Sequence, residues 1–584
     1  MNCYLANVNY RFGENAFLPY SAARLWAYAT ANPGIGERWT LCEILWWREP
    51  ISAVIKRMDA APPDLLGLSL YVWSERYSFE LARAVKRRWP ECIVVAGGPQ
   101  VPEKDTERWW PMAGGVSSLV DFVVVGEGER AFARVLGGCD ERVLRDRLDS
   151  LNDVPSPYLS GVVDDLVTAN AGVKWQALQE TNRGCPYKCT FCDWGSATYD
   201  IVRRFSVRTA IEELEWFARN RIELLYNCDA NFGMLEQDVE FTEALVDVAR
   251  RTGYPRKFRA AYAKKINDRV FGVAKRIADA GLSKGATISF QSMNGDVLKN
   301  VRRLNPVQKS LAETFKRYAD ARVPTYTELI VGLPGETLTS FKRGVAELLS
   351  AGQHRGLAVY PCMALRNSSL SEPISRSVHG LETRTVRLLL LHGEPTDEPV
   401  AEEYELIIAT ASMPHSGWRE TWTWAVIVQA LHGGGLTDVL AHAVCKTTED
   451  YVSFYDDLLS MARAMPSSVL GRALAWWDAA LDEGLAGNEW PTVLPQFGRV
   501  QWPPEEAVFL MVATEAHRLW AELRLHTIHS WTPEEWQRQK EVVALPGDPE
   551  WAGHPARYAQ EVVWYGRKGR TTRTSEPARS GEIS

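Results

Sequence analysis

Histidine is scarce in this chain of 584 residues and is absent before His354. The first half of the chain therefore offers no imidazole to a metal or a cofactor. The sequence also lacks an uninterrupted apolar run long enough to span a bilayer, which takes roughly 20 residues. With 66 basic and 73 acidic side chains the net charge is -7, so the basic excess typical of nucleic-acid-binding proteins is missing.

An export signal is missing as well, because Met1–Asn7 has neither a basic region nor an apolar segment. We therefore expect a cytoplasmic protein with no nucleic-acid or membrane partner. In that compartment the 10 cysteines do not predict a disulfide framework. Most of them are scattered along the chain and are interpreted as small buried apolar side chains. The length predicts two or three domains.

Continuous apolar runs alternate with helical patterns at the start of the chain. Short, wholly apolar strands between helices are typical of a doubly wound parallel sheet that is covered on both faces. We predict such an α/β, Rossmann-like domain over residues 1–145, with strands at Cys3–Val8, Trp39–Trp46, Leu65–Tyr71, Ile93–Ala96 and Phe122–Val125. Ligands of these sheets bind beyond the carboxyl ends of the strands. The candidates there are Ser69, Tyr71, Trp73, Gly97, Gly98, Gly126 and Glu127.

A second βα series follows an expected linker over residues 146–174. Its regular repetition predicts a partial (β/α)6 barrel over residues 175–384. The expected strands are Trp175–Thr181, Leu224–Asn227, Phe258–Tyr262, Thr287–Gln291, Thr325–Val331 and Leu357–Tyr360. Residues 385–565 are predicted to form a mainly helical domain, and the tail over residues 566–584, rich in Arg, Thr, Ser and Gly, is predicted to be disordered.

Three cysteines are crowded into the loop after the first strand of this series, which reads RGCPYKCTFCDWG from Arg183. Cys185, Cys189 and Cys192 are soft thiolate ligands suited to iron–sulfur clusters or to zinc. At this spacing they can hold three corners of a four-iron, four-sulfur cube and leave the fourth iron open. Zinc is the alternative and needs a fourth Cys or His. No histidine precedes His354, and Cys228, far downstream of the loop, could in principle serve.

The cysteine spacing, the aromatic Phe191 before the third cysteine and the βα series resemble the radical S-adenosylmethionine (SAM) superfamily, over roughly Trp175–Asn367. The resemblance implies that SAM chelates the open iron and is cleaved to a carbon radical. It also implies SAM contacts near the strand ends; an ordinary polar turn is the alternative for two of them, Asp229 and Asn231. The implied contacts are Phe191, Asp229, Asn231, Ser289, Gln291, Ser292, Glu328, Gly332 and Gly335.

An open α/β sheet upstream of such a barrel resembles the cobalamin-binding subclass of this superfamily. The resemblance implies that the loops at Ser69–Tyr71 and Gly97–Gly98 hold the corrinoid. The first loop, Asn7–Gly13, departs from related cobalamin proteins because it has no cobalt-ligating histidine. We therefore expect base-off cobalamin without a histidine ligand, its lower face covered by the Tyr71–Trp73 loop or by water. A degenerate domain that binds no corrinoid is the alternative.

These features together predict a cobalamin-dependent radical SAM methyltransferase. It would pass a methyl group from SAM through methylcobalamin to a carbon of a small-molecule or peptide-derived substrate, in natural-product biosynthesis. An external electron donor such as flavodoxin or ferredoxin would reduce the cluster. The alternatives are a rearrangement or oxidation with the same cofactors, a non-catalytic cobalamin or iron–sulfur sensor, and methylthio transfer, which would want a further cysteine triad.

Overall fold

The structure is a computed structural model that describes residues 1–12, 15–106, 109, 119–196, 201–305, 311–445, 450–527 and 529–542. The predicted disordered tail, residues 566–584, and Gly13 lie outside the described residues. The chain forms two compact units. The first comprises Met1–Lys284, Ala364–Ser375 and Thr396–Tyr404, and the second comprises Gly285–Met363, Arg376–Pro395 and the described part of Glu405–Ser584.

The first unit begins with the predicted parallel sheet, which has six strands within the described residues in the order β3-β1-β4-β5-β6-β7. The strand order reverses between β1 and β4, which is the point where open α/β sheets bind their ligands. All the apolar runs predicted as strands here are confirmed. The strands are β1 (Asn2–Asn9), β3 (Thr40–Trp47), β4 (Leu65–Ser69), β5 (Ile93–Gly97), β6 (Phe122–Val124) and β7 (Val143–Leu144).

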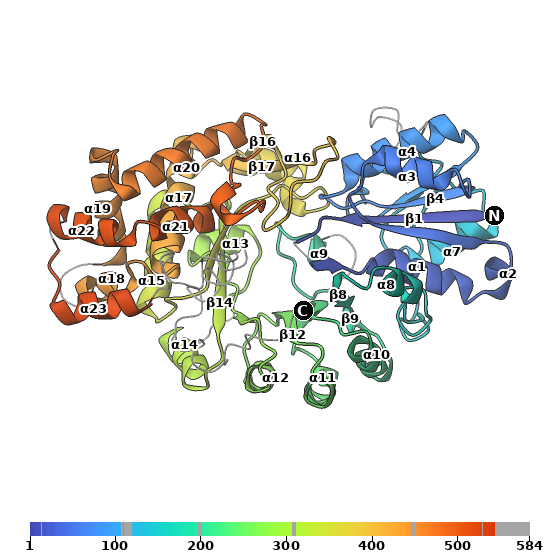
Figure 1. The fold of residues 1–584 in the computed structure, drawn as a ribbon, viewed down its shortest axis with the longest axis horizontal. Helices are drawn as coiled ribbons and strands as arrows, with labels where there is room; N and C mark the ends of the chain where they lie inside the picture. Colours follow the sequence, from blue (N-terminus) through green and yellow to red (C-terminus); the bar gives the residue numbers. More distant parts are fainter. Residues whose placement is uncertain are drawn as a thin grey trace. The chain divides into compact units, whose positions relative to one another are not determined.

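Helices cover both faces of this sheet (Figure 1). On one face lie α3 (Ile51–Met58) and α4 (Glu75–Arg88). On the other face α1 (Tyr20–Thr30) packs against α7 (Glu129–Gly137). This two-sided cover explains why the strands are apolar without alternation, since both of their faces are buried.

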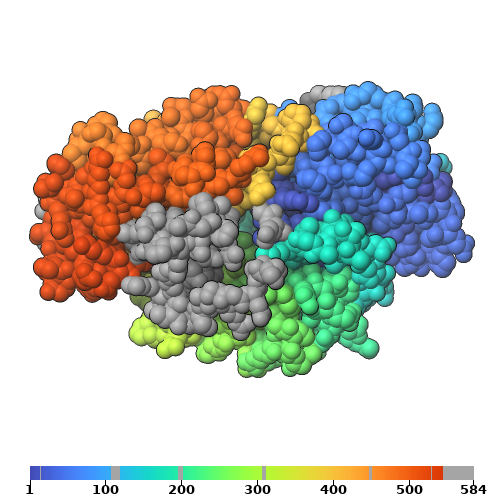
Figure 2. Space-filling view, viewed as in Figure 1, coloured from blue at the N-terminus to red at the C-terminus, as the bar shows by residue number. Residues whose placement is uncertain are grey.

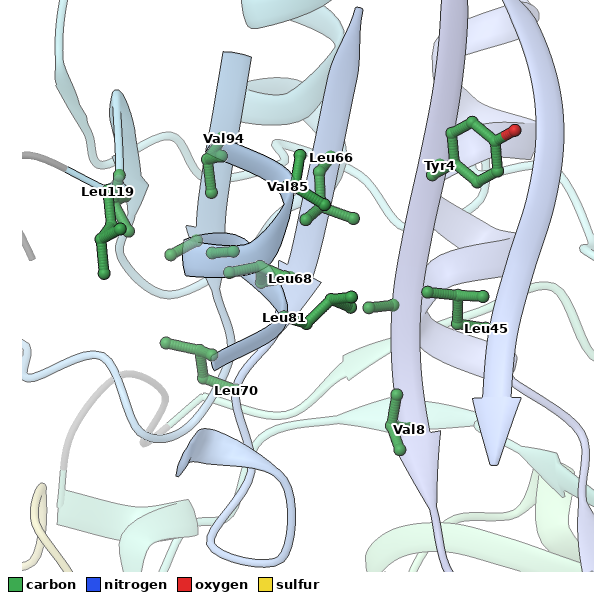
Figure 3. Close-up of a cluster of buried hydrophobic side chains, with 14 of the residues drawn as sticks. Tyr4, Val8, Leu45, Leu66, Leu68, Leu70, Leu81, Val85, Val94 and Leu119 are labelled. Atoms are coloured by element: carbon green, nitrogen blue, oxygen red, sulfur yellow. The ribbon is translucent and has the colours of Figure 1, made fainter. Parts of the chain in front are cut away.

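The core beneath α4 is built from aliphatic side chains of the helix and of the central strands (Figure 3). Leu81 and Val85 of α4 are fully buried, as are Leu66 of β4 and Val94 of β5. Close packing of this kind holds the strands in one arrangement. The loops at their carboxyl ends, where the candidate ligand-binding residues lie, are therefore carried on a rigid support.

A second parallel sheet of the first unit has the order β12-β11-β8-β2 among the described strands. Three of these strands were predicted, whereas β2, which pairs Ala16 with Trp175, was missed because it is short and precedes the sheet by a long stretch of chain. The strands are β2 (Asn15–Phe17), β8 (Lys174–Gln179), β11 (Leu224–Phe232) and β12 (Lys257–Tyr262). The remaining helices of this unit are α2 (Pro33–Gly36), α8 (Asp164–Ala169), α9 (Asp193–Ser196), α10 (Val207–Arg219), α11 (Gln237–Thr252) and α12 (Asp268–Asp279).

The second unit continues the βα series with the parallel sheet β13-β14-β15. Its strands are β13 (Ala286–Thr287), β14 (Thr325–Val331) and β15 (Leu357–Pro361). The strand predicted over Thr287–Gln291 is regular only at its start and continues as one isolated bridge, from Gln291 to Leu329. Gln291 has a φ of 66°, which interrupts the extended backbone.

The C-terminal region is mainly helical, as predicted, but it also contains β16 (Glu382–Arg387), which pairs with β17 (Glu403–Ala409). The helices of the second unit are α13 (Gly295–Asn300), α14 (Leu311–Asp320), α15 (Leu338–Ser350), α17 (His415–Val428), α18 (Asp438–Cys445), α19 (Tyr451–Ala464), α20 (Val469–Leu485), α21 (Pro504–Ala513), α22 (Ala516–His526) and α23 (Pro533–Val542). Helices α18 to α23 give the orange and red surface of this unit (Figure 2). None of the helices in the described ranges is long and apolar enough to cross a membrane.

The segment predicted as a linker, residues 146–174, is packed into the first unit, of which it is a part. Leu148, Leu151 and Val154 are buried and form a small core with Phe205. The segment also contains the short helix α8. The sequence did not reveal this packing, because the few apolar side chains of the segment are separated by prolines and acidic residues. The domain boundaries drawn at residues 145 and 175 stay a prediction.

Candidate cofactor site

The cysteine loop leaves the end of β8 and carries its thiols into buried positions. Cys185 and Cys189 are 4% and 2% exposed, and Cys192 is half-buried. At the start of the loop β9 (Asn182–Arg183) pairs with β10 (Arg203–Arg204). The amide of Cys192 donates to the carbonyl of Cys189 at 3.1 Å, and α9 begins at the next residue. All three thiols therefore lie on one short, constrained loop.

Two polar side chains, one from β11 and one from the chain just beyond β12, reach the sulfurs of this loop. Asn231 Nδ2 lies 3.2 Å from Cys185 Sγ, and Lys264 Nζ lies 3.3 Å from Cys189 Sγ. The sulfurs here are thiols, and each stands in for a thiolate that would ligate iron. Thiolates with nearby N–H donors are typical of iron–sulfur sites, so this donor set fits a four-iron, four-sulfur cluster. Sequence reasoning missed Lys264, because a lone basic residue two positions after β12 does not reveal that it approaches the cysteine loop.

The zinc alternative needs four ligands that meet at one point. Within the described residues no group of three or more His, Cys, Asp and Glu side chains is arranged to hold one metal ion. Cys228, the candidate fourth ligand, instead donates its thiol to the carbonyl of Tyr226 at 3.7 Å. The described residues therefore offer no ligand set for a single zinc ion. The thiolates of a four-iron cluster each bind a different iron, so they do not need to meet at one point.

Asp229 holds the backbone that precedes the cysteines. Its buried carboxylate accepts hydrogen bonds from the amides of Thr181 and Asn182, at 2.8 and 3.0 Å. The Thr181 hydroxyl and the Asn182 side-chain amide also donate to it. Burial raises the pKa of Asp229 to about 7, although these hydrogen bonds act in the opposite direction. Both carboxylate oxygens of Asp229 thus accept hydrogen bonds from residues at the start of the cysteine loop and hold that backbone in place. The contact of Asp229 with SAM stays a prediction.

The other residues predicted to contact SAM fall into two groups. Phe191 is half-buried within the cysteine loop of the first unit. Ser289, Gln291 and Glu328 are brought together in the second unit, where the Ser289 hydroxyl donates to the Glu328 carboxylate. The backbone N–H of Gln291 donates to the backbone carbonyl of Glu328 at 2.8 Å. These contacts join the chain after β13 to β14 in the sheet of the second unit.

The remaining predicted SAM contacts, Ser292, Gly332 and Gly335, lie around the turn after β14. The Ser292 hydroxyl donates to Glu336 at 2.5 Å, and burial raises the pKa of that carboxyl. Gly335 has a φ of 90°, and a Cβ at this position would lie 2.5 Å from Asn300 Nδ2. A side chain would therefore be strained there. The turn leads into α15, whose first turn is closed by a capping box at Thr337.

A cavity of about 690 Å³ lies in the first unit beyond the carboxyl ends of the N-terminal sheet. Arg183 and Gly184 of the cysteine loop and Cys228 of β11 also line it, so the cavity extends from that sheet to the start of the cysteine loop. Its volume is in the range of cofactor-binding sites. Every residue predicted to bind cobalamin lines this cavity, namely Ser69, Tyr71, Trp73, Gly97, Gly98, Gly126 and Glu127.

Glycine and stacked aromatic rings shape the cavity wall. Gly98 has a φ of 106°, and a Cβ there would lie 2.8 Å from the Leu70 carbonyl oxygen, so only glycine fits. The rings of Tyr71 and Trp73 stack with their centroids 4.5 Å apart and an interplanar angle of 13°. Trp73 Nε1 is buried without a hydrogen-bond partner in the described part of the chain. A flat wall with an unused donor fits a large planar ligand such as a corrinoid.

Arg183 joins the cysteine loop to the acidic turn of the N-terminal sheet. Its guanidinium forms ion pairs with Glu127, Glu129 and Glu180 at 3.2, 3.0 and 2.8 Å. Burial alone would raise the pKa of Glu129, but the charge of Arg183 outweighs it and the pKa is lowered. Glu127 also forms an ion pair with Arg203. Sequence reasoning had placed Glu127 at the ligand and had missed Arg183 as its partner.

The N-terminal sheet has a cavity at its switch point and is followed by a βα series with a cysteine triad. This combination defines the class of radical SAM enzymes with a cobalamin-type domain. The family model of the radical SAM superfamily matches residues 180–346. The cobalamin-dependent radical SAM methyltransferase TokK of Streptomyces tokunonensis is 38% identical over 488 residues, which cover 78% of this chain and 70% of TokK. The 2-(S-pantetheinyl)-carbapenam-3-carboxylate methyltransferase of Streptantibioticus cattleyicolor is 38% identical over 493 residues, or 79% of this chain and 70% of that enzyme.

A solved structure has a similar fold. The cobalamin-dependent S-adenosylmethionine radical enzyme OxsB, with aqua-cobalamin bound, aligns with a TM-score of 0.53 and 14% identity over 97% of this chain and 84% of the OxsB chain. The chain belongs to the cobalamin-dependent radical SAM methyltransferases. Its cofactors are a four-iron, four-sulfur cluster, SAM and cobalamin. The predicted fold class, activity and cofactors are confirmed, and the roles of single residues stay predictions.

Proposed function

We propose that this methyltransferase acts on a carbon atom of a small molecule of the carbapenam type, in natural-product biosynthesis. The support comes from the relative of Streptantibioticus cattleyicolor, which is named for 2-(S-pantetheinyl)-carbapenam-3-carboxylate and is 38% identical over 79% of this chain. Of the two substrate classes expected from the sequence, this observation favours the small molecule over the peptide.

In this proposal Cys185, Cys189 and Cys192 ligate the cluster, and the cavity of the first unit holds cobalamin. When bound, the cofactors supply the reductive cleavage of SAM and the transfer of a methyl group through cobalt. The chain orients them: Asp229 clamps the cysteine loop, and Arg183 ties that loop to the cavity wall. The observation that carries the proposal is that one cavity is lined both by every predicted cobalamin-binding residue and by the start of the cysteine loop.

Cobalamin is proposed to bind base-off and without a histidine ligand. The residues of the first unit include no histidine, so no imidazole of this unit is available to cobalt. The stacked pair Tyr71 and Trp73 supplies a flat surface for the lower face instead. The electron paramagnetic resonance (EPR) spectrum of the Co(II) form is therefore expected to lack nitrogen splitting from a lower ligand. A clear three-line nitrogen splitting would contradict this binding mode.

An external low-potential protein, of the flavodoxin or ferredoxin type, is proposed to reduce the cluster in the cytoplasm. The prediction is checked by replacing dithionite with reduced flavodoxin in the assay. Turnover of SAM with flavodoxin, and none without a reductant, is the expected result. Equal turnover in the absence of any added reductant would contradict it.

The proposed activity is tested with the full-length enzyme after anaerobic reconstitution with iron, sulfide and hydroxocobalamin. Incubation with SAM and 2-(S-pantetheinyl)-carbapenam-3-carboxylate is expected to give a product heavier by one CH2 group, together with S-adenosylhomocysteine and 5′-deoxyadenosine. Formation of 5′-deoxyadenosine with no methylated product would favour a rearrangement or oxidation. Bound cofactors without any SAM turnover would favour a sensor, and absence of corrin absorbance after desalting would refute the cobalamin site.

A further inference from the structure

We propose that Lys264 and Asn231 tune the iron–sulfur cluster by donating N–H groups to two of its cysteine thiolates, which raises its reduction potential. The inference rests on the proposed ligation of the cluster by Cys185, Cys189 and Cys192. It goes beyond that proposal because it assigns a function in electron transfer to two residues that do not ligate iron.

Lys264 is held close to the cysteine loop by the strand that precedes it. The amide of Ala263 donates to the carbonyl of Phe232 at 2.9 Å, which fixes the residue before Lys264 to the end of β11. Its Nζ lies 4.5 Å from the ring centroid of Tyr187 and 3.3 Å from Cys189 Sγ. The ammonium group thus makes a cation–π contact and a sulfur contact within the same loop. These two contacts direct it at the cluster position and not at solvent.

Asn231 reaches the cluster position from the neighbouring strand. The residue is 1% exposed, and its Nδ2 lies 3.2 Å from Cys185 Sγ. Its side-chain oxygen is buried without a hydrogen-bond partner in the described residues. Among the described residues, the contact with Cys185 is therefore the hydrogen bond that this side chain makes. Because Phe232 pairs with Tyr262, the ends of β11 and β12 bring Asn231 and Lys264 to the same loop.

The physical effect of both donors has the same sign. Reduction adds one electron to the cluster, so positive charge and N–H dipoles at its sulfurs favour the reduced form. Cys185 and Cys189 are nearly fully buried, and water therefore screens these interactions little. The ammonium of Lys264 carries a full charge and the amide of Asn231 does not. The effect of Lys264 is thus expected to be the larger of the two.

The inference is tested by potentiometric EPR titration of the anaerobically reconstituted full-length enzyme. Lys264→Met is expected to shift the reduction equilibrium on the order of tenfold toward the oxidised cluster, which is about 59 mV for a one-electron couple. Asn231→Leu is expected to shift it in the same direction by less. Lys264→Arg keeps the charge and is expected to restore most of the potential. Lys265→Met removes an exposed neighbouring ammonium and is the matched control, expected to leave the potential unchanged.

The outcomes separate this inference from the proposed function. A wild-type enzyme that holds no four-iron cluster refutes the proposed function. A Lys264→Met enzyme with full iron and sulfide content and the wild-type potential overturns the inference alone. Lys264→Gln, which removes the charge but keeps a polar side chain, is titrated in parallel. Loss of the cluster from both variants would assign Lys264 a structural role and would overturn the inference as well.

Discussion

Replacing Arg183 by methionine removes the positive charge that joins the cysteine loop to the acidic turn of the N-terminal sheet. The side chain of Arg183 is 17% exposed, and those of its partners Glu127, Glu129 and Glu180 are 3%, 5% and 18% exposed. Methionine keeps a similar volume but cannot donate hydrogen bonds. Glu129 would then be buried with only its weaker interaction with Arg24 to stabilise its charge, whereas Glu127 keeps its ion pair with Arg203.

Breaking a buried ion pair by removing one partner costs about 3–5 kcal/mol, because the other charge stays buried. We expect Arg183→Met to lower the free energy of unfolding by about 3 kcal/mol at pH 7. The double variant with Glu129→Gln removes the orphaned charge and is expected to recover about 1–2 kcal/mol. Arg208→Met is the control, since Arg208 is 87% exposed in its pair with Glu212 and such pairs contribute about 0.5 kcal/mol or less.

The pH dependence follows from the sign of the shift at Glu129. In the wild type its folded-state pKa is lowered from 4.5, so the ion pair stabilises the fold above that pH and the stabilisation is lost as the pH falls through the folded pKa. Without Arg183 we expect burial to outweigh the remaining charge of Arg24 and to raise the folded-state pKa of Glu129 above 4.5. The variant therefore loses stability as the pH rises, and the gap to the wild type widens from about pH 4 to pH 7.

Urea unfolding of the cofactor-free proteins, followed by tryptophan fluorescence, checks both expectations. A structural role for the Arg183 ion pairs is excluded if the free energy of unfolding of Arg183→Met lies within about 1 kcal/mol of the wild-type value at pH 7, or if adding Glu129→Gln does not raise it.

Three further changes test other parts of the structure. Gly98→Ala places a Cβ 2.8 Å from the Leu70 carbonyl oxygen at a φ of 106°. This variant is expected to destabilise the fold by about 1–3 kcal/mol and to bind hydroxocobalamin more weakly in absorbance titrations. Gly137→Ala is the control, because a Cβ at Gly137 would have no neighbouring atom within 4 Å. Burial lowers the pKa of His432 well below 6.5, so wild-type stability should fall as the pH drops below about 6.5, and thermal melts of His432→Asn should lose this slope. Asp229→Asn turns one hydrogen-bond acceptor of the loop clamp into a donor and is expected to lower the free energy of unfolding by about 1–3 kcal/mol. The reconstituted variant is expected to lose iron during gel filtration, and full iron retention would contradict the role of Asp229 as a clamp.

The sequence predicted the N-terminal sheet well because its strands are buried on both faces. Residues 65–68 and 93–97 carry no polar side chain, and no helical period competes with that pattern. The strand predicted over Thr287–Gln291 was less accurate, since Gln291 adopts a positive φ that its residue type does not announce. The short strand β2 could not be predicted, because its pairing with β8 depends on the tertiary fold.

The site was predictable where the chemistry is local in sequence. The cysteine triad occupies one short loop, and the strand-end residues Ser69 and Gly98 are brought together by the ordinary geometry of a parallel sheet. Contacts between distant segments carried no such signal. The pairing of Arg183 with Glu129 and the approach of Lys264 to Cys189 depend on how loops of different strands meet. A lone basic residue after a strand does not reveal its partner.

We propose that three thiolates of one loop hold an iron cube with one open corner. Mössbauer spectroscopy of the anaerobically reconstituted enzyme, with and without SAM, tests this arrangement. We expect a four-iron, four-sulfur cluster in which one iron changes its coordination when SAM is added, and loss of the cluster in Cys185→Ala, Cys189→Ala and Cys192→Ala. A cluster whose irons are unaffected by SAM, or a site that retains only a zinc ion with a fourth protein ligand, would contradict it.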